Sequence, residues 1–192
     1  MDGIFLVIIS YLLGSLTFGE IIARFKGVNL REIGSGNVGA TNVSRALGKK
    51  YGILVFILDM LKGFISTLLA IKIYGLDSWI TFFVGIASVV GHMYPLFFKF
   101  RGGKGVATAF GVLLAISIKA AFLSFLTWLL VVYETRYVSL GSIIASFISL
   151  PLLAIFEYPL KLIFMTLIIS LLVLYKHRDN IWRLLMGREH KI

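Results

Sequence analysis

The chain has 192 residues, of which 59% are hydrophobic and only 15% are charged. A water-soluble domain of this size cannot bury so much apolar surface, so the composition excludes a soluble protein and indicates an integral membrane protein. Cysteine is absent, which excludes disulfides and cysteine metal sites. The formal net charge of +10 suits an anionic membrane face, anionic substrates, or both.

The first 20 residues, MDGIFLVIISYLLGSLTFGE, contain an apolar run that is preceded by an acidic residue rather than a basic one. A cleavable signal peptide begins with a basic region before its apolar run. We therefore expect this run to stay in the protein as a membrane-spanning helix.

Seven apolar runs are candidate membrane spans, since a helix needs about 20 residues to cross the hydrocarbon core. In chain order they cover residues 3–19, 51–71, 78–98, 105–118, 120–133, 137–156 and 158–175. The fourth and fifth runs are short and are separated by Lys119, so they form either one bent helix or a tight hairpin. No internal repeat is visible, and we expect one membrane-embedded domain over residues 1–192.

The positions of the basic residues decide between one bent helix and a hairpin. Fifteen of the 19 lysines and arginines lie in four segments: residues 24–50, 99–104, 134–141 and 176–192. Seven spans place all four segments on one side and leave Lys72, Lys119 and Lys161 on the other. A single span over 105–133 would turn the C-terminal tail away from the first two segments, against the positive-inside rule. We therefore predict an all-α fold of seven transmembrane helices, with the N-terminus outside and the C-terminus cytoplasmic.

Three glycine-rich or polar segments fall on the predicted cytoplasmic side. They are IGSGNVGATNVSR at residues 33–45, GHMYPLFFKFRGGKGVAT at 91–108 and YKHRDNIWRL at 175–184. Each one alone is equally well explained by an ordinary loop or helix end. Three anion-suited segments on one side of a small bundle together indicate a phosphate site.

The second segment has the composition of an anion-binding loop. Its glycines let successive backbone N–H groups point into one concavity, and Lys104 adds a positive charge. A Walker A loop would need a glycine five positions before Gly103 and a serine or threonine after Lys104, but Phe98 and Gly105 stand there. The chain is therefore not a P-loop NTPase. The alternative interpretation of this loop is a hinge between two helices.

The other two segments supply helix ends that suit anions. In the first, we expect Thr41 or Asn42 to cap a short helix ending at Gly48, and helix N-termini bind anions. The third places His177 and Asn180 at i and i+3, on one face of a helix. No histidine or acidic residues show metal-ligand spacing, so we expect neither a metal nor a cofactor.

Three further polar residues lie within or beside the apolar runs. Asp59 and Lys62 are also spaced i and i+3 within the second run, and an ion pair inside a membrane is a candidate functional site. We expect this one to be a structural pair near the membrane edge. For His92, which precedes the letters MYP, we expect a hydrogen bond at a helix end rather than a catalytic role.

The stretches SGNVGATNVSR, GHMYPLFFKFRGGKGVAT and HRDNI resemble the three signature motifs of the PlsY family, the bacterial membrane glycerol-3-phosphate acyltransferases that use acyl phosphate. The resemblance extends over nearly the whole chain in length, number of spans and motif order. It implies transfer of a fatty acyl group from acyl phosphate to the 1-hydroxyl of sn-glycerol 3-phosphate, giving lysophosphatidic acid and phosphate in phospholipid biosynthesis. It also implies a multi-pass acyltransferase of the bacterial inner membrane with a cytoplasmic active site.

The family resemblance and the residue chemistry together give a set of expected site residues. The expected catalytic residues are Ser35, Arg45, Lys104, His177 and Asn180. The residues expected to bind acyl phosphate are Ser35, Gly36, Asn37, Thr41, Gly102 and Gly103. The residues expected to bind glycerol 3-phosphate are Arg45, Lys104, Ser142, His177 and Asn180.

The chemistry of an acyl phosphate is compatible with these residues. This donor carries a good leaving group, so the protein needs mainly to orient two phosphates and to stabilise the developing oxyanion. The His-x-x-x-x-Asp motif of other glycerophosphate acyltransferases is absent. Five positions after His92 stands Phe97, and five positions after His177 stands Trp182. Either His177 or the phosphate of the substrate can take the hydroxyl proton, and the resemblance favours the phosphate.

Two other classes of function remain open from the sequence, a small membrane anion transporter and a lipid-binding membrane protein. A transporter predicts inverted repeats and charged sites deep in the bundle, whereas here no repeat is seen and the candidate site clusters at one face. Lipid binding explains the basic loops but not three glycine-rich or polar segments. The expected partners are the two substrates and membrane lipids, with the enzyme that makes acyl phosphate as a candidate, and no nucleic acid is expected.

Overall fold

The computed structural model describes residues 2–192, and within that range it is helical without β-strands. Its elements are α1 (Gly3–Gly14), α2 (Phe18–Phe25), η1 (Leu30–Glu32), α3 (Ala40–Leu47), α4 (Lys49–Tyr74), α5 (Trp79–Met93), η2 (Leu96–Phe98), α6 (Val106–Ile116), α7 (Ile118–Thr135), α8 (Val138–Ile155), α9 (Leu160–Lys176) and α10 (Arg178–Leu185). The chain forms two compact units, Met1–Val112 and Leu113–Ile192. A single domain over 1–192 stays a prediction.

Most of the expected spans appear as long apolar helices. Within residues 2–192, five segments are long and apolar enough to cross a membrane: Gly3–Phe25, α4, Trp79–Phe98, α7 and α8. The pair α9 and α10, bent by 58°, makes a sixth if it is counted as one span. Helix α6 is apolar but has only 11 residues. The all-helical membrane fold is therefore confirmed, whereas the count of seven and the sides of the two termini stay predictions.

The fourth and fifth apolar runs form two separate helices, α6 and α7. The break falls at Ser117, two residues before Lys119, where the sequence suggested a division. Ser117 is the N-cap of α7, and its hydroxyl accepts a hydrogen bond from the Ala120 N–H at 3.2 Å. A serine at this position satisfies one of the N–H groups that a helix start leaves without a partner.

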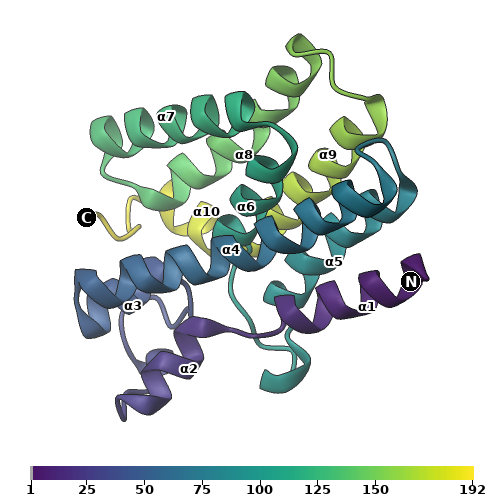
Figure 1. Ribbon diagram of the computed structural model, residues 1–192. Coiled ribbons are helices and arrows are strands. Elements are labelled where there is room, and N and C mark those ends of the chain that lie inside the picture. The colour runs from purple at the N-terminus through teal and green to yellow at the C-terminus, as the bar shows by residue number, and fades with distance from the viewer. Residues whose placement is uncertain (1) are drawn as a thin grey trace. The chain divides into compact units, whose positions relative to one another are not determined.

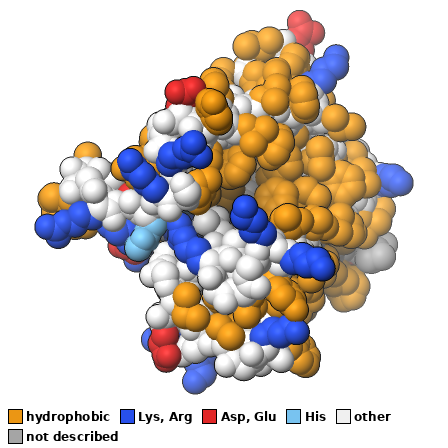
Figure 2. Space-filling model, turned by 90° about the vertical axis from the view of Figure 1, so that its left-hand side faces the viewer, with side chains coloured by type: hydrophobic (Ala, Val, Ile, Leu, Met, Phe, Trp, Pro, Cys, Tyr) orange, Lys and Arg blue, Asp and Glu red, His pale blue; other side chains and the backbone are white. Residues whose placement is uncertain are grey.

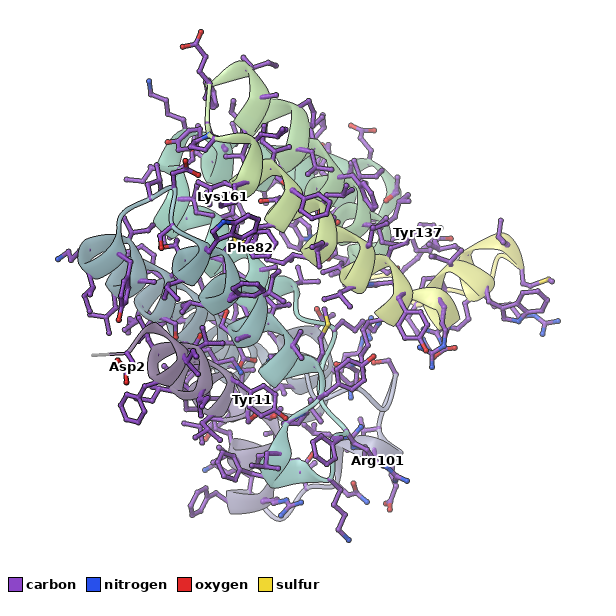
Figure 3. The ribbon with its side chains drawn as sticks, turned by 90° about the vertical axis from the view of Figure 1, so that its right-hand side faces the viewer. Asp2, Tyr11, Phe82, Arg101, Tyr137 and Lys161 are labelled. Atoms are coloured by element: carbon purple, nitrogen blue, oxygen red, sulfur yellow. The ribbon has the colours of Figure 1, made fainter. Side chains whose placement is uncertain are left out.

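In the first unit, α4 lies beside α1, α2, α3 and α5, and α1 also packs along α5 (Figure 1). Glycines bring the backbones of α1 and α5 close together, as is common between membrane helices. A Cβ added at Gly14 would lie 2.3 Å from the Ser88 carbonyl oxygen, and one at Gly91 would lie 2.3 Å from that of Tyr11. The hydroxyl of Tyr11, a residue labelled in Figure 3, donates to the Tyr94 carbonyl at 2.9 Å.

The end of α1 at Gly14 is stabilised by donors outside the helix. The Lys62 ammonium, on α4, donates to the carbonyls of Gly14 and Leu16, each at 2.8 Å. The Ser15 hydroxyl donates to the Tyr11 carbonyl at 2.9 Å. A cation near the C-terminal end of a helix is also favoured by the helix dipole. This arrangement lets the chain turn and start α2 within a few residues.

In the second unit, α7, α8 and α9 pack in chain order, α8 lying between the other two, and α10 follows α9. Side-chain hydrogen bonds join neighbouring helices. The Trp128 indole on α7 donates to the Ser142 hydroxyl on α8 at 3.3 Å, and the Ser170 hydroxyl on α9 donates to the Ser146 carbonyl on α8 at 2.7 Å. The unit therefore presents Ser142 within a packed helix pair.

The surface of the helices is apolar, as expected for contact with lipid. Large hydrophobic side chains such as Ile4, Ile118 and Leu160 are 73%, 74% and 79% exposed. On the face drawn in Figure 2, hydrophobic side chains cover broad areas. Such exposure would be unfavourable in water and is stable in the hydrocarbon core.

Candidate functional site

The first glycine-rich segment forms a turn that is tied to the start of α3 by Asn42. The buried Asn42 side chain accepts a hydrogen bond from the Ser35 N–H at 3.0 Å. Its amide group donates to the carbonyls of Leu30 at 3.2 Å and Ile33 at 2.9 Å. Asn42 therefore holds the segment around η1 against α3.

The expected helix cap at Thr41 or Asn42 is wrong. The N-cap of α3 is Gly39, and both residues lie inside the first turn of the helix. The reason is that the Asn42 side chain is used by the preceding turn, while Asn37 Oδ1 accepts from the Gly39 N–H at 2.8 Å and leads the chain into the helix. The expected end at Gly48 is confirmed, since Gly48 is the C-cap.

The expected ligands of this segment lie close to the turn. Ser35, Asn37 and Thr41 are half-buried, and Arg45 is exposed. A Cβ at Gly34 would lie 3.4 Å from Arg45 Cδ, so the stem of that arginine runs beside the turn. Polar side chains and the stem of one arginine therefore lie beside this turn.

The second segment rests on the C-terminal end of α5. The Gly103 N–H donates to the His92 carbonyl at 3.1 Å. A Cβ at Gly102 would lie 2.0 Å from that carbonyl oxygen, and a Cβ at Gly103 would lie 2.2 Å from His92 Nε2. Neither glycine has a positive φ, unlike Gly105 at +82°. The first two glycines are thus required by close packing on His92, and Lys104 follows them in a half-buried position.

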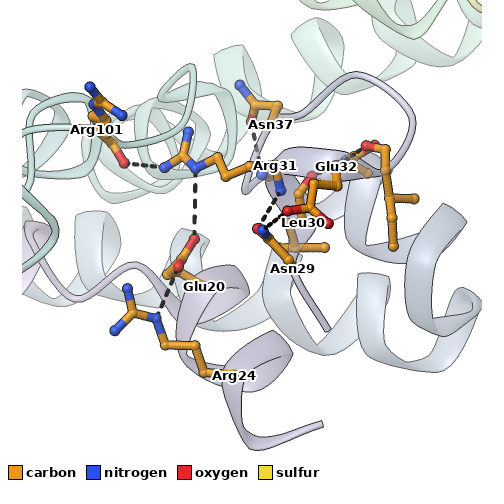
Figure 4. A network of polar contacts seen from close by, with 11 residues as sticks. Glu20, Arg24, Asn29, Leu30, Arg31, Glu32, Asn37 and Arg101 are labelled. Carbon is orange, nitrogen blue, oxygen red and sulfur yellow. Dashed lines mark hydrogen bonds and ion pairs between the residues drawn. The ribbon is translucent and has the colours of Figure 1, made fainter. Parts of the chain in front are cut away.

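The loop of the second segment is also held from the side of η1 (Figure 4). Arg31 Nη2 donates to the Arg101 carbonyl at 2.5 Å. Arg31 Nε lies 4.0 Å from the Glu20 carboxylate, which also accepts from Arg24 Nε at 3.0 Å. Within the first unit, Arg31 thus links the element that precedes the first segment to the loop of the second. The sequence analysis missed Arg31, which stands out in the sequence only as one of many basic residues on the side predicted to be cytoplasmic.

A buried group of charged and polar side chains lies next to that loop. Lys62 Nζ is 2.9 Å from Asp59 Oδ1 and 2.9 Å from His92 Nδ1, and His92 Nδ1 is 3.5 Å from Asp59 Oδ1. All three residues are less than 5% exposed. The expected Asp59–Lys62 pair is confirmed, and it extends to His92. The helix-end hydrogen bond expected of His92 is accepted by its backbone carbonyl.

The third segment lies in the second unit, with His177 at the junction of α9 and α10. His177 is buried, and its Nδ1 lies 2.8 Å from the Val173 carbonyl oxygen. A carbonyl can only accept, so Nδ1 carries the proton and Nε2 of the neutral ring is an acceptor. The buried Asn180 side chain donates to Glu189 at 2.5 Å.

Glu189 is a residue that the sequence reasoning missed. Its carboxylate accepts hydrogen bonds from Ser139 Oγ at 2.8 Å and Arg183 Nε at 2.8 Å as well as from Asn180. Burial raises the pKa of Glu189, but the hydrogen bonds and the charge of Arg183 outweigh burial, so its pKa is lowered overall. The only sign of its role in the sequence is that it is an acidic residue in a strongly basic C-terminal tail.

Ser142 is engaged inside the second unit. Its hydroxyl donates to the Val138 carbonyl at 2.8 Å and accepts from the Trp128 indole. Its expected contact with substrate stays a prediction. Among residues 2–192, no group of three histidine, cysteine or acidic side chains is placed to hold a metal ion.

The family of the chain follows from comparison with known proteins. The model of the family described as glycerol-3-phosphate acyltransferase matches residues 4–187. The chain belongs to the glycerol-3-phosphate acyltransferase family. The expected enzyme class, a membrane acyltransferase of phospholipid biosynthesis, is thereby confirmed.

Individual members of the family are similar over their whole length. The chain is 60% identical over 191 residues to the glycerol-3-phosphate acyltransferase of Aquifex aeolicus (strain VF5), covering 100% of both proteins. It is 45% identical over 190 residues to that of Hydrogenobaculum sp. (strain Y04AAS1), covering 98% of this chain and 96% of the relative.

Solved structures of a family member share the fold. The crystal structure of PlsY, an integral membrane glycerol 3-phosphate acyltransferase, in its glycerol 3-phosphate form has a TM-score of 0.99 and 59% identity, covering 100% of this chain and 96% of that one. The lysophosphatidic acid form has a TM-score of 0.96 and 58% identity over the same shares. The expected PlsY-type family is therefore confirmed.

Proposed function

We propose that the chain transfers a fatty acyl group from acyl phosphate to the 1-hydroxyl of sn-glycerol 3-phosphate, giving lysophosphatidic acid and inorganic phosphate. The observation that supports this most directly is the TM-score of 0.99 to an integral membrane glycerol 3-phosphate acyltransferase in its glycerol 3-phosphate form, at 59% identity. Identity at this level over the whole chain favours the same reaction rather than a related fold with another use.

The choice of acyl phosphate as donor follows from the chemistry of the residues present. In the reaction, the hydroxyl oxygen bonds to the acyl carbon, the bond from that carbon to the phosphate oxygen breaks, and phosphate leaves with the electron pair. Phosphate is a good leaving group, so orientation and charge stabilisation are sufficient. Lysine, arginine and asparagine side chains supply the necessary donors.

Each expected site residue keeps its proposed role. Acyl phosphate would bind to Ser35, Gly36, Asn37, Thr41, Gly102 and Gly103. Glycerol 3-phosphate would bind to Arg45, Lys104, Ser142, His177 and Asn180. The catalytic set would be Ser35, Arg45, Lys104, His177 and Asn180.

Two contacts refine these roles. The Gly103 N–H already donates to the His92 carbonyl, so Gly103 would serve the donor site by shape rather than by that hydrogen bond. The Nδ1 of His177 faces the Val173 carbonyl, so its Nε2 would accept a hydrogen bond from the substrate. We propose that the phosphate of glycerol 3-phosphate takes the hydroxyl proton and that His177 orients the substrate.

We also propose a membrane arrangement for this reaction. Seven spans, with α6 as the shortest, would form one acyltransferase domain over residues 1–192 in the bacterial inner membrane. The N-terminus would lie outside, and the C-terminus and the site would face the cytoplasm. The separation of α6 from α7 and the grouping of basic residues support this arrangement. An enzyme that makes acyl phosphate is the candidate partner.

The test is a direct assay of the purified protein. Incubation with acyl phosphate and glycerol 3-phosphate should release lysophosphatidic acid and phosphate in equal amounts. Replacing the donor by acyl-CoA should give no comparable turnover. Equal rates with the two donors would contradict the proposed donor, and product formation only with acyl-CoA would overturn it.

A further inference from the structure

We propose that His92, fixed by the buried Asp59–Lys62 pair, is a positioning residue that sets the place of the loop carrying Lys104. The inference rests on the proposed function, which assigns Lys104 to substrate binding. The inference gives the buried Asp59–Lys62 pair of α4 a part in the reaction, although neither residue is expected to touch substrate.

The first step of the argument is the contact between the loop and the imidazole ring. The three heavy atoms nearest to a Cβ at Gly103 all belong to that ring, Nε2 at 2.2 Å, Cε1 at 3.0 Å and Cδ2 at 3.2 Å. Because the φ of Gly103 is not positive, backbone conformation does not require glycine there. The requirement comes from the ring, against which the loop lies without any intervening side chain.

The second step is that the ring is held on its opposite side. An ammonium group has three hydrogens to donate, and two of those of Lys62 go to the carbonyls of Gly14 and Leu16 at 2.8 Å. The third is donated to His92 Nδ1 at 2.9 Å, and Asp59 Oδ1 lies at the same distance from Nζ as its ion-pair partner. Rotation of the ring would therefore disturb a buried ion pair, which is costly in a nonpolar surrounding.

The third step connects this cluster to the site. His92 fixes the loop twice, through its ring at Gly103 and through its carbonyl, which accepts from the Gly103 N–H at 3.1 Å. Lys104 directly follows Gly103, so these two contacts also fix the position of the Lys104 backbone. Residues that orient ligands from behind in this way commonly change activity when they are replaced. The cluster thus couples the packing of α1, α4 and α5 to the position of Lys104.

The experiment is a double-mutant cycle between Gly103→Ala and His92→Ala, measured as kcat/KM for glycerol 3-phosphate on purified enzyme. Gly103→Ala alone should lower kcat/KM at least about 10-fold, because the new Cβ meets a ring that cannot move. In the His92→Ala background the same change should cost less than about 2-fold, since the ring is gone. His92→Ala by itself should raise KM more than it lowers kcat.

Gly102→Ala is the matched control. The atoms nearest to its Cβ are the His92 carbonyl oxygen at 2.0 Å, Pro95 Cδ at 2.6 Å and the Met93 carbonyl carbon at 2.9 Å, which His92→Ala leaves in place. Its cost should therefore be equal in both backgrounds. Equal costs for Gly103→Ala in both backgrounds would overturn the inference, because they would mean that Gly103 acts without the ring.

A second variant keeps the test valid if His92→Ala does not fold. His92→Asn retains a polar group near the place of Nδ1 but lacks the atoms at the place of Nε2, and the cycle is run with it in the same way.

Lys104→Ala separates the inference from the proposed function. Near-normal turnover of Lys104→Ala would remove the proposed role of Lys104, whereas an additive cycle with an inactive Lys104→Ala would remove only the role of His92.

Discussion

Two regions of the molecule bury an acidic side chain, and they do so by different means. In the first unit, Asp59 is paired with Lys62 one turn away on the same helix. In the second unit, Glu189 lies in the C-terminal tail and is held by Ser139 on α8 and by Asn180 and Arg183 on α10. The first acid is neutralised by an ion pair built into one helix. The second fastens the tail to the neighbouring α10 and to α8, which is distant in the sequence.

The difference teaches where each region is vulnerable. The pair of α4 is compact and fully buried, so removal of one partner leaves a charge in a nonpolar surrounding. The tail carboxylate shares its charge among three hydrogen bonds, one of them to a proposed substrate ligand, Asn180. Removal of one partner should therefore destabilise the first region as an all-or-none unit. In the second region, removal of the Glu189 carboxylate should loosen only the tail.

The largest effect is expected at the loop beside the first acid. Lys104→Ala should lower kcat/KM roughly 10- to 1000-fold, because the charge-assisted hydrogen bond to substrate and the charge near the oxyanion that we propose for Lys104 would be lost. Steady-state kinetics of protein that elutes as a single species check this. The neighbouring exposed Lys99, changed to glutamine, is the control and should retain most activity. A normal rate for Lys104→Ala would identify the loop as a hinge.

The next effect tests the ion pair itself. Lys62→Met should reduce the free energy of unfolding by about 3–5 kcal/mol, because Asp59 is left buried without its counter-ion. Adding Asp59→Asn should recover part of that loss, since the uncompensated charge is then removed. Thermal unfolding of the purified variants measures both. A double variant that is less stable than Lys62→Met would show that the carbonyl contacts of Lys62, not the pair, carry the stability.

A smaller effect is expected for the tail. Glu189→Gln should destabilise the packing of the tail by about 1.5–3 kcal/mol, the range for hydrogen bonds to a charged group. Hydrogen exchange of residues 186–192 is the measurement, and it should rise while that of α7 stays unchanged. If exchange rises equally in α7 and the tail, the second region is also an all-or-none unit.

The lowered pKa of Glu189 adds a pH dependence of known sign. A carboxylate with a pKa below its ordinary value stabilises the fold above that ordinary value, and the stabilisation is lost as the pH falls through the lowered pKa. Protection of the tail in the unmodified protein should therefore decrease in acid. Protection that increases on acidification would contradict the contacts described for Glu189.

The smallest effect is expected at an exposed acid of the same region. Asp179 lies 3.8 Å from Arg178, and both side chains are more than half exposed. Asp179→Asn should change the free energy of unfolding by less than about 0.5 kcal/mol, because solvent screens such a pair. Thermal unfolding and tail exchange both measure it. A loss as large as that of Glu189→Gln would mean that charge alone, rather than burial, stabilises the tail.

The sequence by itself determined those features that depend on local spacing. Apolar runs of sufficient length predict helices, and the helices occur where the runs do. The i and i+3 spacing of Asp59 and Lys62 predicts a pair, because residues three apart face the same side of a helix. The three motifs identified the family because their letters are specific. The misplaced cap at Thr41 or Asn42 shows the limit, since the Asn42 side chain is used by the preceding turn and Thr41 lies inside the helix.

Only the tertiary structure decided which distant groups meet. The contact of His92 with Gly103, the bond from Arg31 to the Arg101 carbonyl and the closure of Glu189 onto Ser139 join positions between 11 and 70 residues apart. No local periodicity encodes such contacts, because they arise from the way helices pack after they have formed. A glycine is read in the sequence as freedom of the backbone, and the structure shows instead that Gly103 makes room for a histidine ring held by a buried ion pair.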